Sequence, residues 1–378
     1  MRILIFNPSY PPVACGVGDY TRGLAVALVG AGHDVTVVTG ATSTPTADGP
    51  PRVLPLLSTW GVGAFIRAWP RFARARPDIV VSGFPAVVSG SYSRLLYLAP
   101  GLAKATLRRP MTIFIVHEFI RTGEAERRHL RLALRAADLI IAVTEAERDA
   151  IAARYPWSAA RTIVRHNPPT IPTAAEDPAA DARTRASFAP PERPVIGFVG
   201  LLSAPAKGFE ELLEALARTD ALLVATGSLD PANAYHQHVA AEIQRLELDE
   251  RVRWLGFVSD EQAGRLLRAV DAVVLPYRGG AESGYTSMLA ALVNGAAVIT
   301  TRGPQNPAWL RDGETALLVE PEDPAALASA IERLLNDEHL AARLRRGAFS
   351  LPFGWEEIVG AVTAPRRQRR WRAPSRAS

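Results

Sequence analysis

The sequence is poor in cysteine and has no long apolar run. Cys15 is the single cysteine among 378 residues, so no disulfide forms within the chain, as is typical of a reducing compartment. No apolar stretch reaches the roughly 18 to 20 residues that a membrane-spanning helix needs. The opening residues, MRILIFNPS, carry one arginine and a very short apolar run. They predict a first strand and not a signal peptide. We therefore expect a cytoplasmic protein.

Acidic residues are scarce in two parts of the chain. From Pro365 onward there are six arginines and no acid. Residues 1–175 hold 20 basic and 11 acidic residues, a net charge of +9, whereas residues 176–364 hold 17 and 27, a net charge of −10. A basic first half suggests a surface that faces an anionic partner. Two domains that carry complementary surfaces are the alternative reading.

Common patterns for metals and nucleotides are also absent. The sequence has no Walker A spacing and no G-x-G-x-x-G before a helix. Arg121 stands where the H-E-x-x-H pattern beginning at His117 would need its second histidine. His236 and His238 are two residues apart, which places them on different faces of a helix. We expect no bound metal and no cofactor.

The length predicts two domains, because 378 residues exceed one ordinary core. Residues 1–40 have the pattern strand, loop, helix, strand, which begins a doubly wound sheet with ligands at the carboxyl ends of its strands. The loop carries Gly16 and Gly18, where the backbone can approach a ligand closely. His117 follows the apolar strand 111–116 and lies at such an end, although a lone histidine is more often structural.

A second strand, loop and helix lie in residues 194–218. Val195–Val199 is a short apolar run, and apolar residues recur at helical spacing from Phe209 to Leu216. Lys207 lies between the two, where a cation and the free N–H groups of a helix start suit a phosphate. On this stretch alone, a plain strand–helix turn with a surface lysine is the simpler reading. Further along, Thr286 or Ser287 is positioned to cap the helix 288–293.

Four blocks in this order resemble the retaining glycosyltransferases of family 4, which have the GT-B fold. They are PPVACGVGDYTRGLAVALVGAGHDVTVVT, VGLLSAPAKGFEELLEAL, GFVSDEQAGRLLRAVDAVVLP and ESGYTSMLAALVNGAAVITT, with His117 between the first two. The resemblance implies an α/β protein of two Rossmann-like, doubly wound domains facing each other across a cleft. It implies an acceptor domain (1–169), a linker (170–193), a nucleotide-sugar domain (194–349), a crossover helix packing back on the first domain (350–364) and a basic, disordered tail (365–378).

The resemblance also assigns roles to single residues. His117 and Glu282 correspond to the active-site histidine and to the acid beside the sugar. Lys207, Gly16, Gly18 and Thr286 correspond to the surroundings of the donor diphosphate. Phe257 and Val258 lie where the family holds the nucleobase.

The sequence departs from the family at two positions. Leu201 stands where an arginine usually accompanies the lysine, and Ala290 replaces the second acid, which usually holds the ribose. Arg278 is a speculative substitute for the missing cation.

The resemblance thus implies a metal-independent retaining glycosyltransferase that uses a UDP-, GDP- or ADP-sugar. The acceptor is a glycan, a small molecule or a lipid-linked group, and the basic first half suggests an anionic acceptor and peripheral attachment at the inner face of the membrane. A binding subunit that has lost catalysis is the first alternative, and a nucleotide-sugar epimerase is a weaker one. No specific nucleic-acid binding is expected, because the composition of the arginine-rich tail is equally typical of a disordered chain end.

Overall fold

The computed structural model describes residues 1–13, 15–40, 50–57, 69–72, 74, 76–85, 87–88, 91–92, 94–200, 202, 205–348 and 354–364. The chain forms two compact units, the first from residues 1–168 and 354–378 and the second from residues 169–353. Leu201, the expected tail 365–378 and residues 350–353 of the expected crossover helix lie outside the described residues.

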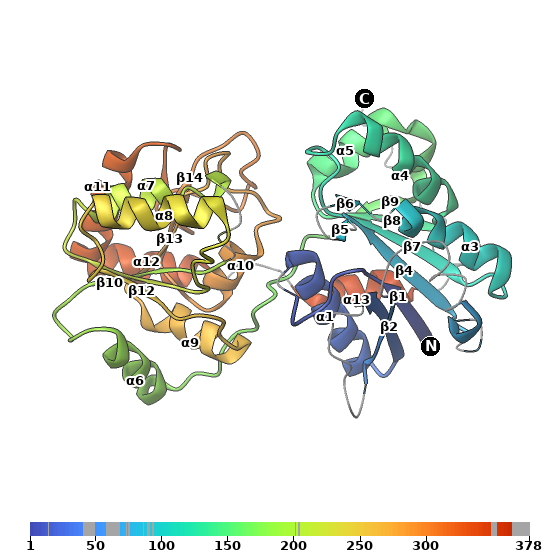
Figure 1. Cartoon of the computed structure of the whole chain (residues 1–378), viewed down its shortest axis with the longest axis horizontal. Coiled ribbons are helices and arrows are strands. Elements are labelled where there is room, and N and C mark those ends of the chain that lie inside the picture. Colours follow the sequence, from blue (N-terminus) through green and yellow to red (C-terminus); the bar gives the residue numbers. More distant parts are fainter. Residues whose placement is uncertain are drawn as a thin grey trace. The chain divides into compact units, whose positions relative to one another are not determined.

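The first unit is built on a parallel sheet (Figure 1). Its elements are β1 (Arg2–Phe6), α1 (Gly16–Gly30), β2 (Asp34–Gly40), β3 (Arg52–Leu57), β4 (Ile79–Phe84), β5 (Val87–Val88), β6 (Ser91–Tyr92), η1 (Arg94–Leu98), α3 (Ala99–Thr106), β7 (Met111–Val116), α4 (Glu124–Ala136), β8 (Leu139–Ala142), α5 (Glu145–Arg154), η2 (Pro156–Arg161), β9 (Thr162–Val164) and α13 (Trp355–Thr363). Seven strands pair in the order β3-β2-β1-β4-β7-β8-β9. All six residues of β7 are buried and five of them are apolar, as a sheet covered by helices on both faces requires.

The C-terminal helix α13 packs on α1 inside the first unit. A side chain on Gly23 would bring its Cβ within 2.2 Å of the Trp355 ring, so this glycine lets the two helices approach. The Trp355 ring also lies 5.2 Å from that of Tyr20. The expectation that a C-terminal helix packs back on the first domain is confirmed.

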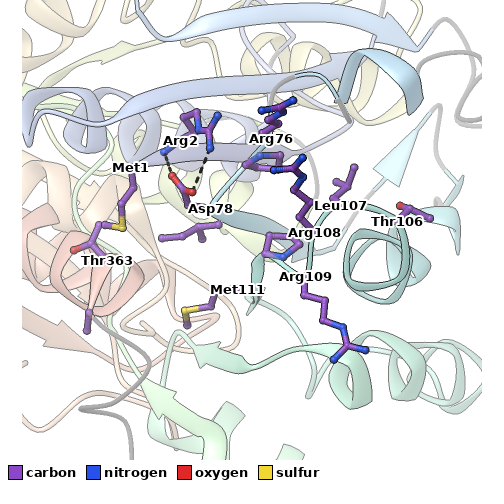
Figure 2. A pocket seen from close by; sticks show the side chains of 14 residues that line it. Met1, Arg2, Arg76, Asp78, Thr106, Leu107, Arg108, Arg109, Met111 and Thr363 are labelled. Carbon is purple, nitrogen blue, oxygen red and sulfur yellow. Dashed lines mark hydrogen bonds and ion pairs between the residues drawn. The ribbon is translucent and has the colours of Figure 1, made fainter.

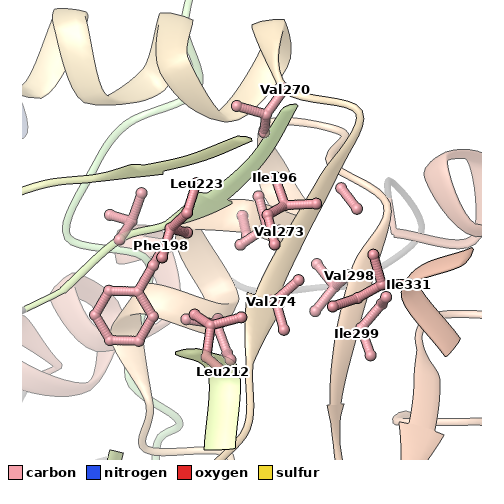
Figure 3. Close-up of a cluster of buried hydrophobic side chains, with 14 of the residues drawn as sticks. Ile196, Phe198, Leu212, Leu223, Val270, Val273, Val274, Val298, Ile299 and Ile331 are labelled. Atoms are coloured by element: carbon pink, nitrogen blue, oxygen red, sulfur yellow. The ribbon is translucent and has the colours of Figure 1, made fainter. Parts of the chain in front are cut away.

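The second unit repeats the design. Its elements are α6 (Pro178–Phe188), β10 (Val195–Phe198), η3 (Pro205–Lys207), α7 (Phe209–Leu216), β11 (Leu222–Ala225), α8 (Ala234–Arg245), β12 (Val252–Trp254), α9 (Asp260–Ala269), β13 (Ala272–Leu275), α10 (Thr286–Val293), β14 (Val298–Thr301), β15 (Leu317–Val319), α11 (Pro324–Asn336) and α12 (Glu338–Ala348). Six parallel strands pair in the order β12-β11-β10-β13-β14-β15. Figure 3 shows the core between this sheet and its helices, where Ile196, Val273 and Ile331 are fully covered or nearly so.

Both sheets are doubly wound, as expected. In each one the chain first builds outward on one side of its first strand and then returns to the other side. The order therefore reverses between β1 and β4 in the first unit and between β10 and β13 in the second. In open α/β sheets, ligands bind outside the carboxyl ends of the strands at this reversal.

Part of the expected linker is helical. Residues 178–188 form α6, whose N-cap Asp177 accepts a hydrogen bond from Ala180 N, and α6 packs on α9 within the second unit. Ser259 caps the start of α9, where it forms a reciprocal capping box with Gln262.

Candidate functional site

Two loops meet at the reversal of the second sheet. The loop after β10 carries Lys207, and the loop after β13 runs from Pro276 to Tyr285. Gly208 joins them: its backbone is left-handed, with a φ of 67°, and an added Cβ would come 1.8 Å from the Pro276 carbonyl oxygen. The backbone N–H of Arg278 also donates to the carbonyl oxygen of Ala206. The Lys-Gly pair therefore lies directly against the end of β13.

Two tyrosine rings hold the side chain of Lys207. Its ammonium Nζ lies 5.2 Å from the ring centre of Tyr277 and 5.0 Å from that of Tyr285, and the two ring centres are 4.1 Å apart. Each cation–π contact contributes about 0.5–2 kcal/mol, more where water is excluded. Burial raises the pKa of Tyr277, so its phenol stays neutral. The rings thus hold the ammonium before any ligand arrives.

The N-terminus of α10 opens beside this lysine. Tyr285 is the N-cap residue, and no side chain caps the helix, so the expectation that Thr286 or Ser287 caps it is wrong. The helix begins two residues earlier than predicted, which places Thr286 at its first position. No acidic residue lies in the first turn. Gly200 lies against this end, since a Cβ there would approach Ser287 Oγ to 2.7 Å.

Arg278 is held by acids of α7. Its Nε lies 2.7 Å from a Glu211 oxygen, and its Nη2 lies 3.4 Å from a Glu210 oxygen. These two carboxylates occupy the first turn of α7, where they favour the helix dipole. Arg278 is therefore already paired, and the start of α7 is less suited to an anion than the start of α10.

The remaining residues expected in this unit lie along the same sheet edge. Glu282 is half-buried in the loop after β13, and its carbonyl oxygen accepts from Tyr285 N. Phe257 and Val258 follow β12. Phe257 is 87% exposed, more than any other large apolar side chain in the described ranges. An aromatic face so open to solvent is available for stacking.

Ala290 is buried in the core. It is 0% exposed on α10 and belongs to the apolar cluster of the second unit. This position therefore does not open to solvent, and the place of the family's second acid is filled by core packing. Leu201, the other departure, lies outside the described residues.

In the first unit, the loop after β1 leads to the start of α1. Gly16 is exposed at the first position of α1, and a Cβ there would meet nothing within 4 Å. Gly18 is buried, and a Cβ there would lie 3.1 Å from the Ser9 carbonyl oxygen. Asn7 fixes this loop by donating to the Val17 carbonyl oxygen. Gly18 thus serves the packing of the loop, and Gly16 presents open backbone.

His117 follows β7 at the carboxyl edge of the first sheet. Its ring packs edge-on against Tyr20, with 4.6 Å between ring centres, and bonds to the Asn167 side chain. Burial lowers the pKa of His117 to about 4, although the bond to Asn167 opposes the shift. The imidazole is therefore neutral at pH 7. Rings connect it through Tyr20 to Trp355 of α13.

Within the described ranges, no group of three or more His, Cys, Asp or Glu side chains is arranged to hold a metal ion. In the same ranges, no helix combines the length and apolar character needed to cross a bilayer.

Sequence reasoning missed the tyrosines around Lys207. One signal was available: the chain has two lysines against 41 arginines, so a lysine is a rare choice in this sequence. A lysine presents a compact ammonium to the two rings, whereas an arginine would present a planar fork. Lys207 and the two tyrosines come together only because the loop after β13 lies against the loop after β10, and no local sequence pattern encodes that contact.

Two family models match the chain. Residues 14–168 match "Glycosyltransferase Family 4" and residues 193–337 match "Glycosyl transferases group 1", and together they span well over half of the chain.

Curated relatives match over part of the chain. D-inositol 3-phosphate glycosyltransferase of Corynebacterium efficiens is 29% identical over 186 residues, which are 47% of this chain and 42% of that protein. The lipopolysaccharide core biosynthesis glycosyltransferase LpsE of Rhizobium meliloti is 32% identical over 173 residues, 45% of this chain and 46% of that protein. The matched segments span less than half of the length of these relatives.

Solved structures match over nearly the whole chain. Sucrose-phosphate synthase from Thermosynechococcus elongatus has a TM-score of 0.72 at 22% identity, covering 97% of this chain and 98% of that one. HepE from Anabaena, solved with UDP-glucose, has a TM-score of 0.71 at 20% identity, covering 96% and 95%. These likenesses show the fold.

Proposed function

Because the chain belongs to the group 1 glycosyltransferases of family 4, we propose that it transfers a sugar, with retention of configuration, from a nucleoside diphosphate sugar to an acceptor. The observation that carries the proposal is the ammonium of Lys207, held by Tyr277 and Tyr285 beside the uncapped start of α10. That place is the reversal of the second sheet, where this class of fold binds ligands.

Lys207 and α10 bind the donor diphosphate. As the bond from the sugar to the diphosphate breaks, negative charge grows on the leaving oxygen. A cation held in advance and the N–H groups at a helix start stabilise that charge without moving at the moment of reaction. Thr286, at the first position of α10, supplies a hydroxyl to the same diphosphate. In the first unit, Gly16 and Gly18 shape the backbone that faces the phosphates.

Glu282 and His117 act on the sugar. The carboxylate of Glu282 accepts hydrogen bonds from sugar hydroxyls. His117 bonds to the sugar as an uncharged imidazole, since burial lowers its pKa to about 4. Its neutrality suits the reaction, because positive charge develops on the sugar ring in such transition states and an imidazolium would oppose it.

Phe257 and Val258 hold the nucleobase. A ring that is 87% exposed can stack on a base at a favourable free energy of about 1–3 kcal/mol. The complex of the structurally similar HepE with UDP-glucose supports a nucleotide-sugar donor. UDP-, GDP- and ADP-sugars are the donors to test. Because Arg278 is paired with Glu211, Lys207 is the cation that we assign to the diphosphate.

The reaction uses no metal and no cofactor in this proposal, because a lysine and a helix start supply the positive charge that a divalent ion would otherwise bring. The test is turnover after exhaustive treatment with EDTA. Full loss of activity that returns with Mg²⁺ or Mn²⁺ would contradict metal independence. It would not contradict the residues that we assign to the donor site.

We further propose that the acceptor is anionic or lipid-linked and that the enzyme attaches peripherally to the inner face of the membrane. The support is the net charge of +9 in residues 1–175. Each basic residue near an anionic leaflet contributes about 1 kcal/mol. Co-sedimentation with anionic vesicles, but not with neutral ones, is the expected result at low salt. Equal binding to both would contradict the idea.

A donor screen tests the main proposal. The full chain is heated with UDP-, GDP- and ADP-sugars, and release of the nucleoside diphosphate is measured in parallel. A true donor raises the melting temperature, because it binds the native state alone. The anomeric configuration of the product, read by NMR, tests retention. Binding without turnover would favour a binding subunit that has lost catalysis, the alternative that the buried Ala290 supports. If the chain neither binds nor turns over any of these sugars, the proposal is overturned.

A further inference from the structure

A second pocket lies in the first unit, at the end of the sheet opposite to the one that carries His117. A pocket of about 630 Å³ opens at the amino ends of β1, β4 and β7, next to the end of α13 (Figure 2). Strand β7 starts at this pocket with Met111 and ends just before His117. Its six residues separate the two places by roughly 20 Å at about 3.3 Å per residue. The pocket shares no residue with the proposed transferase site.

The lining is strongly basic. Four arginines and one acid line the pocket, namely Arg2, Arg76, Arg108, Arg109 and Asp78. Asp78 is already engaged by Arg2, since the Asp78 carboxylate accepts from Arg2 N at 2.7 Å and the two side chains pair at 3.6 Å.

Arg76 and Arg108 are the cations left for a ligand. Among the described residues, neither side chain has a hydrogen-bond or ion-pair partner. Figure 2 shows the side chain of Arg109 directed away from these two. Within the part of the chain that the structure describes, the pocket therefore keeps two arginine side chains that are not paired with an acid.

The backbone supports these arginines in a costly conformation. Arg76, Arg108 and Arg109 have φ angles of 43°, 39° and 52°, in the left-handed region that favours glycine. They are three of the five non-glycine residues with positive φ in the described ranges, and all three line this pocket. Arg76 and Arg109 also precede prolines, which restricts them further. Such outliers concentrate at functional sites. An arginine where glycine would be easier indicates that its side chain is needed.

Phosphate is the ligand that fits. Guanidinium groups match the geometry of phosphate oxygens, and a phosphate monoester carries about −1.5 to −2 charges at pH 7, enough for two arginines. The arginines are exposed, and buried apolar residues, among them Leu107 and Met111, complete the lining. Beyond Ala364, which also lines the pocket, the sequence continues into a stretch with six arginines and no acid.

We propose that this pocket, with Arg76 and Arg108 as its cations, binds a phosphate-bearing anion. The phosphate belongs either to an anionic lipid headgroup or to a free phosphoryl compound. The site does not depend on the transferase activity, because the residues and the sheet edge are different.

The test combines loss of charge with relief of strain. Arg76→Gly with Arg108→Gly removes both cations and gives each backbone the residue that its φ favours. We expect the melting temperature to stay equal or rise, while affinity for the anion falls about fivefold per arginine. The matched control is Arg128→Gln with Arg131→Gln, which removes two exposed arginines from α4 in the same unit.

Two probes distinguish the sources of phosphate. Inorganic pyrophosphate is titrated calorimetrically, and vesicles of phosphatidylglycerol or of phosphatidylcholine are co-sedimented with the full chain. Weaker binding of pyrophosphate by the pocket variant supports a free phosphoryl compound, and weaker binding of phosphatidylglycerol vesicles alone supports a lipid headgroup. Equal affinities of the pocket and control variants for both probes would overturn the proposal, as would a wild type that binds neither. Peripheral attachment through other basic residues would survive that result.

Discussion

The ammonium nitrogen of Lys207 lies 5.0 Å from the centre of the Tyr285 ring, at the point where the second sheet reverses its strand order. Tyr285 is also the N-cap residue of α10. One side chain thus links the lysine to the start of the helix that we assign to the diphosphate.

Replacing Lys207 by alanine should lower kcat by roughly a hundredfold, since one electrostatic contact that strengthens in the transition state is worth on the order of 3 kcal/mol. Affinity for the donor should change little. Lys207→Arg should not restore the rate, because a planar guanidinium does not occupy the same place as a compact ammonium. The control is Lys104→Arg at the only other lysine, which pairs with Asp138. A wild-type kcat/KM in Lys207→Ala would show that the stretch is a plain strand–helix turn.

Tyr285→Ala should lower kcat, whereas Tyr285→Phe should leave it nearly unchanged. The Tyr285 ring contacts the ammonium, and one cation–π contact is worth about 0.5–2 kcal/mol, or roughly two- to thirtyfold in rate. The kinetics of both variants with the preferred donor decide the matter. Equal rates for Tyr285→Ala and wild type would mean that Tyr277 alone positions Lys207.

Much of this unit could be predicted from local pattern. Helix α7 was predicted as Phe209–Leu216 and found there, because four apolar residues at helical spacing fix both its ends and its buried face. The strand before it ends at Phe198, one residue earlier than predicted. The spacing of apolar residues shows which side chains are buried, and the burial of those side chains determines where these helices and strands form.

The site was harder to predict, because a pattern says nothing about which loops meet. Lys207 was located correctly at the carboxyl end of β10. Its contacts with Tyr277 and Tyr285 depend on the chain returning 70 residues later to the neighbouring strand β13. The same holds for Arg278, which pairs with Glu211. It also holds for Ala290, whose burial could not be told from its place in the motif.

Gly208→Ala should destabilise the second unit strongly. The new methyl group would sit 1.8 Å from the Pro276 carbonyl oxygen, at a backbone φ of 67° that disfavours any side chain. Gly313→Ala is the matched control, because its φ is 69° and a Cβ there meets nothing within 4 Å. The control should cost about 1–2 kcal/mol, and Gly208→Ala should cost clearly more. Urea unfolding measures both. Equal losses would mean that the loops after β10 and β13 move apart readily.

Ala290→Glu should unfold the protein and should not tighten donor binding. The alanine is 0% exposed within the core. A carboxylate placed there without a partner must be neutralised or drive the helix outward, at a cost of several kcal/mol. Ala290→Ser, which adds one hydroxyl, is the milder control. The melting temperature without ligand is the measurement. A variant as stable as wild type that binds the donor more tightly would show that α10 presents this position to the ribose after all.

His117 should make stability depend on pH between about 4 and 6.5. Burial lowers the pKa of His117 to about 4, whereas in the unfolded chain it is near 6.5. Between these values the unfolded state binds more protons than the folded state, so the free energy of unfolding rises with pH. The contribution is complete above about 6.5 and is lost progressively as the pH falls toward 4. The slope from one such group approaches about 1.4 kcal/mol per pH unit.

His117→Gln should remove this slope, because glutamine does not titrate. Urea unfolding of wild type and variant at several pH values between 4.5 and 7 (roughly the window set by the two pKa values) gives the difference, in which the carboxylates common to both proteins cancel. The control is His339→Gln, which removes an exposed histidine of α12. The control should keep the wild-type slope. If His117→Gln keeps it too, folding does not lower the pKa of His117, and the argument that burial keeps this imidazole uncharged beside the sugar fails.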